Sequence, residues 1–301
     1  MKLVKGHGTE NDFLVLPDLD GAVRLTDELV RALCDRHAGL GADGVLRVVR
    51  CENDPDGKEF AADAEFFMDY RNADGSVAEM CGNGIRVFYA YLSRAGLVEQ
   101  YAAVATRGGT RRVRALGAGD FSVAMGVPRI LADRPIATAA PHSPGRGAVV
   151  LMPNPHVVVP LPDLATLAAL DLTRAPVVEP PRPTGQNVEF VVRTGPRAIQ
   201  MRVHERGVGE TRSCGTGICA AAVATAATDG VGADGRPWRV EVPGGVCEVV
   251  WHPDGEVELI GPAVLVADLE VDDDWLRRRT PSRRTPRSPS AEPLPLSAMA
   301  P

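Results

Sequence analysis

Short segments with apolar residues at alternate positions recur along most of the chain. Runs of this length and period, rich in Val, Ile, Leu and Phe, are typical of half-buried strands. Dipeptides such as Asp74-Gly75 and Gly244-Gly245 place turns between them. The pattern predicts many strands and few helices. Examples of the predicted strands are Asp12 to Leu16, Gly44 to Val49, Glu65 to Arg71, Arg111 to Leu116, Phe121 to Met125, Ala148 to Met152, His156 to Val159, Val188 to Val192, Ile199 to His204, Arg239 to Val242, Val246 to Trp251 and Glu256 to Ile260.

A first helix is predicted from Thr26. A threonine followed by two acidic residues is a suitable N-cap, because its hydroxyl accepts from a free backbone N–H and the acids face the positive helix end. The apolar face of this helix carries Leu29, Val30, Leu33, Cys34 and His37. Cys34 is therefore expected in the core.

Two further helices are predicted at Ile85 to Leu92 and Ile218 to Ala227. Both segments are apolar around almost their whole circumference, which predicts helices buried on every side. Gly96 and Gly230 follow them at the position where a left-handed C-terminal cap is needed.

These two helices belong to an internal repeat. Cys81-Gly82-Asn83-Gly84-Ile85 aligns with Cys214-Gly215-Thr216-Gly217-Ile218 at an offset of 133 residues, and the same offset places Met68 on Met201. The repeat predicts an α+β fold of two similar domains, each a strand barrel wrapped around one buried central helix, related by a pseudo-twofold axis. The predicted domains are residues 1–127 and 128–275, with the boundary in the Pro-rich stretch Pro128 to Pro144 and a last strand able to return to the first domain.

Composition adds a tail and an acidic body. The segment Arg277 to Pro301 holds six Arg, six Pro and one Glu without apolar periodicity, so we expect residues 276–301 to be a disordered tail. The whole chain has a formal net charge of −6, which leaves about −11 for residues 1–276. An acidic body argues against binding to nucleic acid.

Targeting signals and membrane spans are not expected either. No apolar run approaches the ~18 residues that cross a bilayer, and the first residues do not resemble an export signal. The expected location is therefore the cytoplasm, where the six cysteines would be thiols.

The two Cys-Gly-x-Gly turns carry the candidate chemistry. Glycines before a helix let backbone N–H groups converge, and the helix dipole adds positive potential, so an anion is favoured there. A cysteine at that place is expected to have a pKa lowered from about 8.5 toward neutrality. If the repeats pack symmetrically, Cys81 and Cys214 face each other across an interdomain cleft, where a thiolate and a thiol can invert a stereocentre by proton transfer.

A set of motifs in order along the chain resembles the diaminopimelate epimerase family. The resemblance covers residues 1 to about 270, that is, everything but the tail. The motifs are Gly6-His7-Gly8-Thr9-Glu10-Asn11-Asp12-Phe13, Arg71-Asn72-Ala73-Asp74-Gly75-Ser76, Ala78-Glu79-Met80-Cys81-Gly82-Asn83-Gly84-Ile85-Arg86, Asn154-Pro155-His156, Asn187-Val188-Glu189-Phe190, and Glu205 to Thr211 with Cys214-Gly215-Thr216-Gly217.

The resemblance implies an isomerase that interconverts LL- and meso-2,6-diaminoheptanedioate for lysine and peptidoglycan synthesis, without cofactor or metal and usually as a homodimer. It implies that Cys81 and Cys214 are the acid and base, and that His156 and Glu205 adjust their pKa values. The implied ligands of the substrate are the backbone at Gly82, Asn83, Gly215 and Thr216 and the side chains of Asn11, Asn72, Asn154, Asn187, Glu205 and Arg206. One departure is Gly44, where some relatives have a Gln that reaches the site.

Other readings remain open at this point. A racemase of the same superfamily acting on proline-like substrates would keep both cysteines but has less use for Arg206 and the asparagines. A cysteine hydrolase needs one nucleophile and no matched second thiol, and a non-catalytic anion-binding module would need only the glycine turns. A pyridoxal lysine is not excluded by pattern alone, whereas a zinc site is disfavoured because no Cys-x-x-Cys pair exists. The remaining cysteines are expected to be structural, namely Cys34, Cys51, Cys219 and Cys247.

Overall fold

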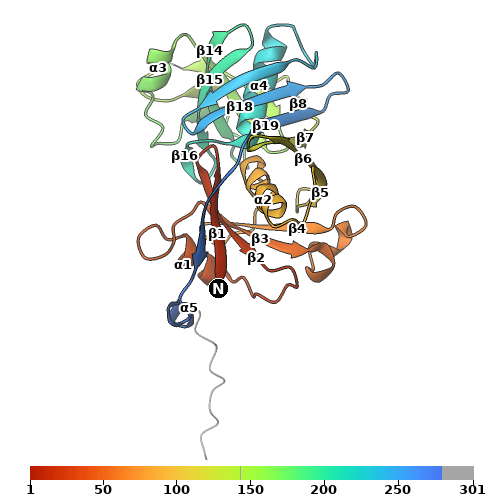
Figure 1. Cartoon of the computed structure of the whole chain (residues 1–301). Coiled ribbons are helices and arrows are strands. Elements are labelled where there is room, and N and C mark those ends of the chain that lie inside the picture. Colours follow the sequence, from red (N-terminus) through yellow and green to blue (C-terminus); the bar gives the residue numbers. More distant parts are fainter. Residues whose placement is uncertain (143, 280–301) are drawn as a thin grey trace, which may run out of the picture.

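The computed structural model describes residues 1–142 and 144–279 and shows a mixed α+β molecule built mostly from strands (Figure 1). In its first half, strands pack around one helix, α2. The strands of this half are β1 (Lys2–Gly8), β2 (Asn11–Pro17), β3 (Gly44–Arg50), β4 (Phe66–Asn72), β5 (Tyr101–Ala105), β6 (Arg111–Gly117) and β7 (Asp120–Gly126), and its helices are α1 (Asp27–Cys34), α2 (Gly82–Arg94) and the short 3-10 helices η1 (Cys51–Asn53) and η2 (Lys58–Phe60).

The second half repeats the plan around helix α4, which contacts β11, β12, β14, β15, β17, β18 and β19. Its elements are β8 (Arg129–Ile130), β9 (Ile136–Thr138), β10 (Gly145–Arg146), β11 (Ala148–Leu151), β12 (Pro155–Leu161), α3 (Leu164–Ala169), β13 (Val177–Glu179), β14 (Asn187–Gly195), β15 (Ala198–Glu205), β16 (Gly209–Thr211), α4 (Gly215–Thr228), β17 (Pro237–Val242), β18 (Gly245–Trp251) and β19 (Val257–Pro262). The predicted class of two similar α+β halves is confirmed, while closure of each half into a barrel stays a prediction.

The chain then returns to the first half. Strand β20 (Val264–Glu270) runs antiparallel to β1, so the last strand of the described chain lies beside the first, as Figure 1 shows. A second link joins the halves, because β7 of the first half pairs antiparallel with β19 of the second.

Helix α1 begins where the sequence predicts. The Thr26 hydroxyl accepts a hydrogen bond from the Leu29 N–H at 3.3 Å, which satisfies a free donor of the first turn. The helix ends at Cys34, which is buried. The expectation that His37 lies on its face is therefore wrong: His37 is an exposed residue beyond the helix, where the Asp35 side chain accepts its backbone N–H at 2.8 Å.

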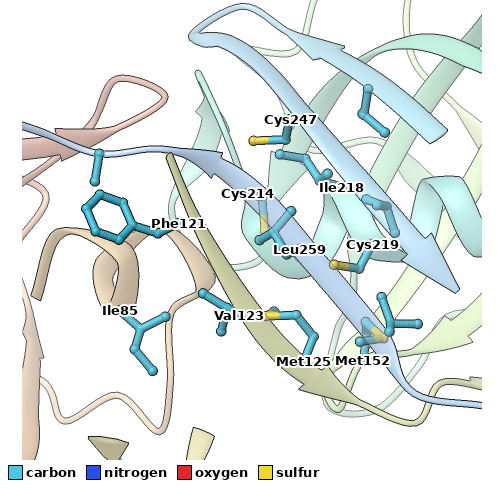
Figure 2. Packing of buried hydrophobic residues seen from close by; sticks show 14 of the residues in the cluster. Ile85, Phe121, Val123, Met125, Met152, Cys214, Ile218, Cys219, Cys247 and Leu259 are labelled. Atoms are coloured by element: carbon cyan, nitrogen blue, oxygen red, sulfur yellow. The ribbon is translucent and has the colours of Figure 1, made fainter. Parts of the chain in front are cut away.

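Helices α2 and α4 are buried along nearly their whole length, as their uniform apolar pattern predicts. Gly96 and Gly230, after their last turns, have φ of +68° and +70°, the left-handed conformation that glycine adopts without a Cβ clash. A single core cluster joins the two helices. Figure 2 shows it extending from Ile85 of α2 through Val123 and Leu259 to Ile218 of α4.

The predicted tail begins too early. Residues Asp273–Arg279 form helix α5, which packs beside α1, and its Trp275 and Leu276 contact the cluster that contains Leu3 and Leu29. The acidic start and basic end of α5 suit the helix dipole. The remainder of the predicted tail, from Thr280, lies outside the described residues. Within the described part of the chain, no helix is long and apolar enough to cross a membrane.

Candidate active site

The starts of α2 and α4 meet at the boundary of the two halves. A Cβ atom added to Gly215 would lie 2.9 Å from the Cα of Gly82 and 3.2 Å from the backbone nitrogen of Asn83. Side chains at these positions would keep the helices apart, so the first glycine of each Cys-Gly-x-Gly turn permits the close approach. The two cysteine turns of the repeat are thereby brought together.

A cleft of about 590 Å³ opens at this meeting point and is lined from both halves. Every site residue that the sequence analysis named lines it, except His156. The predicted residues that line the cleft are Asn11, Asn72, Cys81, Gly82, Asn83, Asn154, Asn187, Glu205, Arg206, Cys214, Gly215 and Thr216. Polar residues that the sequence analysis did not assign to the site also line it, and these are Asp43, Tyr70, Asp74, Ser76, Thr211 and Ser213.

Each cysteine occupies the N-cap position of its helix. The half-buried Cys81 Sγ accepts from the Gly84 backbone N–H at 3.3 Å, and its thiol donates to Asn11 Oδ1 at 3.6 Å. Cys214 is buried, with its Sγ 3.5 Å from the Thr216 hydroxyl. Both sulfurs therefore lie where a helix start presents free N–H groups.

Burial nevertheless controls the acidity of these thiols. It raises the pKa of Cys81 to about 11, against the lowering effect of the Gly84 N–H, and the Glu205 carboxylate adds to the rise. For Cys214, burial and then the carboxylates of Glu205 and Glu189 raise the pKa well above its usual value. The expectation that the helix start lowers both pKa values toward neutrality is therefore wrong for this conformation, because desolvation of the thiolate outweighs the N–H contacts.

Glu205, at the end of β15, is a carboxylate whose charge raises the pKa of both cysteine thiols. Burial raises its pKa, and hydrogen bonds with the side chains of Thr211 and Cys214 act in the opposite direction. The next residue, Arg206, is exposed at the rim. Its backbone N–H donates to Asn187 Oδ1 at 2.8 Å, and its guanidinium donates to the Thr184 carbonyl at 2.7 Å.

Asn83, which lines the cleft, also links the two halves. Its buried side-chain amide donates to Asn11 Oδ1 at 3.2 Å and to the Ser213 carbonyl at 3.0 Å. Its Oδ1 accepts from Arg86 at 3.1 Å. With its amide hydrogens and oxygen occupied in this way, the side chain of Asn83 holds the two cysteine turns in register.

His156 lies behind the cleft instead of lining it. The ring is fully buried on β12, with Nδ1 2.6 Å from Glu189 Oε1 and Nε2 3.0 Å from Asn154 Oδ1. It reaches the cleft through Asn154. A direct effect of His156 on the thiol pKa values stays a prediction.

The atoms around Gly44 leave no room for a side chain at this position. A Cβ at Gly44 would lie 2.5 Å from the Arg71 carbonyl oxygen and 2.8 Å from the Tyr70 ring. A glutamine therefore does not fit this position without a shift of the backbone. Asp43, the preceding residue, lines the cleft and accepts from the Asn11 amide at 2.7 Å.

The residues that the sequence analysis did not assign to the site differ in how strongly the sequence itself indicates them. Ser213 directly precedes Cys214 and Asp43 directly precedes Gly44, so their positions beside two residues already considered for the site could have indicated them. Glu189 stands in the motif with Asn187, whereas nothing in the sequence marks Tyr70 as a cleft residue. Among residues 1–142 and 144–279, no group of three or more His, Cys, Asp or Glu side chains is placed to hold a metal ion.

The arrangement places two thiols, which can exchange protons, beside polar groups able to bind both signs of charge. The thiols come from opposite halves, and the helix starts favour a carboxylate. The carboxylates of Glu205 and Asp43 can bind ammonium groups, and the guanidinium of Arg206 can bind a carboxylate. This combination suits a small zwitterionic substrate.

Comparisons with known proteins agree with this chemistry. A family model described as "Diaminopimelate epimerase" matches residues 3–131 and 148–266. The chain is 53% identical over 281 residues to a protein of Streptomyces coelicolor named diaminopimelate epimerase, covering 91% of this chain and 96% of the relative. A protein of the same name from Thermobifida fusca is 49% identical over 277 residues, covering 90% and 98%.

A solved structure shares the fold at much lower identity. It is that of a probable proline racemase from Agrobacterium radiobacter, with a TM-score of 0.64 and 18% identity, covering 91% of this chain and 93% of that one. This likeness establishes the two-domain architecture and does not bear on the substrate.

Proposed function

The chain belongs to the diaminopimelate epimerase family, and from that premise we propose that Cys81 and Cys214 are its two proton-transfer residues. The family activity interconverts LL- and meso-2,6-diaminoheptanedioate, which makes the protein an isomerase. We assign it to lysine and peptidoglycan synthesis. The observation that carries the residue assignment is that the two thiols cap facing helices and line one cleft.

The reaction needs a base on one face of the α-carbon and an acid on the other. The thiolate of one cysteine takes the proton, so that an S–H bond forms as the C–H bond breaks, and the electron pair passes into the substrate carboxylate. The thiol of the other cysteine then gives its proton to the opposite face. The raised pKa of Cys81 favours this step, since its thiolate is a strong base toward a weakly acidic C–H group.

The starts of α2 and α4 stabilise the charge that builds up on the reacting carboxylate. The backbone N–H groups of Gly82, Asn83, Gly215 and Thr216 are the proposed donors, and they act where negative charge increases in the transition state. These residues stand in the first turns of α2 and α4, directly after the two cysteines, which supports this assignment.

The polar side chains that line the cleft are proposed to bind the distal amino and carboxylate groups of the substrate, those at the end away from the reacting carbon. Arg206 is the proposed partner of the distal carboxylate, and Asn11, Asn72, Asn154, Asn187 and Glu205 hold the remaining groups. An analogue without the distal amino acid would leave several of these groups unpaired. Discrimination against such a substrate is therefore expected to be on the order of 10⁴.

Incubation with the LL substrate in D2O tests the mechanism. At low conversion the product should carry deuterium at the inverted carbon while recovered substrate remains unlabelled, because each face has its own exchanging thiol. Product that keeps its original hydrogen contradicts the two-base assignment. L-proline, assayed in parallel, should not be racemised, and its racemisation would favour the alternative substrate class.

We further propose that the protein acts as a cytoplasmic homodimer. Its six cysteines are free, as thiol chemistry in a reducing compartment requires. Strand β20 pairs with β1 along one edge, no other described strand pairs with it, and Val264 and Val266 on it are 45% and 59% exposed. An open edge of this kind can pair with a second copy.

Sedimentation equilibrium tests the proposed dimer. The measured mass should be twice the chain mass, and Val266→Lys should shift the protein toward monomer.

A further inference from the structure

Glu189 is a buried carboxylate on β14, the strand beside His156. Both side chains have no solvent exposure, and Glu189 Oε1 lies 2.6 Å from His156 Nδ1. The other oxygen, Oε2, has no hydrogen-bond partner among the described residues. A charge buried in this way is tolerated only when it is paired. The His156 ring is the one group in hydrogen-bond contact with this carboxylate among the interactions of the described chain.

A second feature supports an ionised Glu189. A Cβ added to Gly217 would lie 2.7 Å from Glu189 Oε1, so the carboxylate sits against the first turn of α4. The start of a helix stabilises negative charge. Glu189 also contributes to the raised pKa of Cys214 and Glu205, as an anion close to both does.

The partners of His156 restrict where its protons are. An ionised carboxylate only accepts hydrogen bonds, so Nδ1–H donates to Glu189. The second ring nitrogen, Nε2, lies 3.0 Å from Asn154 Oδ1, and an amide oxygen also only accepts. A ring with both partners in this arrangement carries both protons, and its positive charge balances Glu189.

The state of the ring decides what Asn154 presents to the cleft. With Nε2–H donating to Oδ1, the Nδ2 hydrogens of Asn154 are left for the cleft that this side chain lines. With a neutral ring, Nε2 would become an acceptor, the amide would turn round, and its oxygen would face the substrate. The first arrangement binds a carboxylate and the second an ammonium group.

We propose that Glu189 is a positioning residue that keeps His156 doubly protonated and thereby fixes the Asn154 amide with its hydrogens toward a substrate carboxylate. The identity of that substrate rests on the function proposed above, whereas the proton arrangement does not. Another acid in this environment is Glu205: burial raises its pKa, and the charge of His156 acts in the opposite direction.

The test combines nitrogen NMR of the histidine ring with kinetics. Protein labelled with ¹⁵N-histidine, without substrate, should show His156 with two protonated ring nitrogens near neutral pH, assigned by the signals lost in His156→Gln. In Glu189→Gln, which keeps the shape and removes the charge, His156 should show one protonated and one bare nitrogen. The KM for the LL substrate should rise about tenfold or more, since a charge-assisted contact is lost, with a smaller fall in kcat.

Two further variants separate positioning from a structural effect. Glu189→Asp keeps the charge and should restore part of the affinity and the doubly protonated ring. Glu248→Gln, an exposed glutamate on β18, should alter neither measurement. Thermal unfolding of each variant checks that the fold is kept.

The outcomes distinguish the two proposals. A wild-type His156 with a bare nitrogen, or an unchanged His156 signal in Glu189→Gln, overturns the role of Glu189 whatever the activity. The expected NMR pattern in a protein that does not epimerise the LL substrate supports the proton arrangement and overturns only the substrate. An altered ring signal with unchanged KM overturns the link to Asn154.

Discussion

A thiol at a helix start experiences two opposed effects, and in Cys81 and Cys214 the effect of burial is larger. The free N–H groups stabilise a thiolate, but loss of water destabilises it more, so both pKa values rise. The motif around each cysteine was readable from the sequence because spacing alone defines it. The depth of burial was not, because it depends on how closely the two halves pack.

The two cysteines should be individually indispensable. A serine hydroxyl fits either site but is a far weaker acid, so Cys81→Ser and Cys214→Ser should each lower kcat by about 10²–10⁴-fold in both directions. Polarimetric assays of LL and meso substrate measure this. Cys51→Ser is the matched control, since Cys51 is buried away from the cleft in η1, and its activity per folded molecule should match the wild type. A fully active Cys81 or Cys214 variant would contradict the mechanism.

The raised thiol pKa values set the expected pH dependence. Burial raises the pKa of the Cys81 thiol to about 11 and also raises the pKa of Cys214 well above its usual value, so both cysteines of the free protein are neutral thiols near pH 7. Because the proposed mechanism requires one thiolate, kcat/KM should increase from pH 6 to pH 9 by up to about tenfold per pH unit. Initial rates at low substrate concentration measure this. A profile that falls between pH 7 and 9 would show that other groups control the reaction.

Features of the site that depend on contacts between residues distant in the sequence could not be predicted from the sequence. Asn11, Asn72, Asn154 and Asn187 were predicted because each stands in a motif of its own. The depth at which His156 lies was not visible, since it depends on the pairing of β12 with β14, which brings Glu189 against the ring opposite its local partner Asn154.

At the level of elements, the predicted strands all coincide with observed ones, with ends that differ by at most three residues. Two strands outside this set, β1 and β20, lack a clear alternation of apolar and polar residues. Strand β1 mixes lysines, a histidine and two glycines, and β20 has apolar residues on both faces, with Val264 and Val266 exposed and Leu265 half-buried. Strand β20 gains its ladder from β1, at a sequence distance that no local pattern reports, whereas β1 pairs with β20 and also with the neighbouring β2.

The approach of α2 to α4 gives a prediction for a single methyl group. Gly215→Ala places a carbon 2.9 Å from Gly82 Cα, so the helix starts must separate by several tenths of an ångström. Misplacement of the reacting groups on this scale should lower kcat by about 10-fold to 10²-fold. Steady-state kinetics and a thermal melt measure the two effects.

A glycine outside the site provides the control. Gly195, at the end of β14, has only Ala198 within contact of an added Cβ, at an ordinary 3.4 Å. Gly195→Ala should leave kcat and KM unchanged. Equal losses in the Gly195 and Gly215 variants would mean that the cost is general and does not come from the meeting of the helices.

The whole molecule should unfold as one unit. Pairing of β7 with β19 and of β1 with β20 joins the halves, and one apolar cluster contains residues of both central helices. Urea unfolding followed by tryptophan fluorescence and by far-UV circular dichroism should give coincident transitions. Two separate transitions would contradict this coupling.

A fragment of residues 1–127 provides the corresponding test of independence. It contains the whole of the first repeat but lacks β19 and β20, so β7 and β1 would each lose a partner and part of the apolar cluster would be exposed. The fragment should show no cooperative transition. Adding residues 256–279 on a flexible linker should restore one.

The return of β20 to β1 also has a consequence for biosynthesis. Translation proceeds from the N-terminus at roughly 5–20 residues per second, so a nascent chain complete to the end of β7 waits roughly 7 to 28 s for the strand that closes its own half. During that interval one edge of β1 and the apolar surface under it stay open on the ribosome. Chaperones that bind nascent chains should therefore contact the first half for longer than its length alone implies.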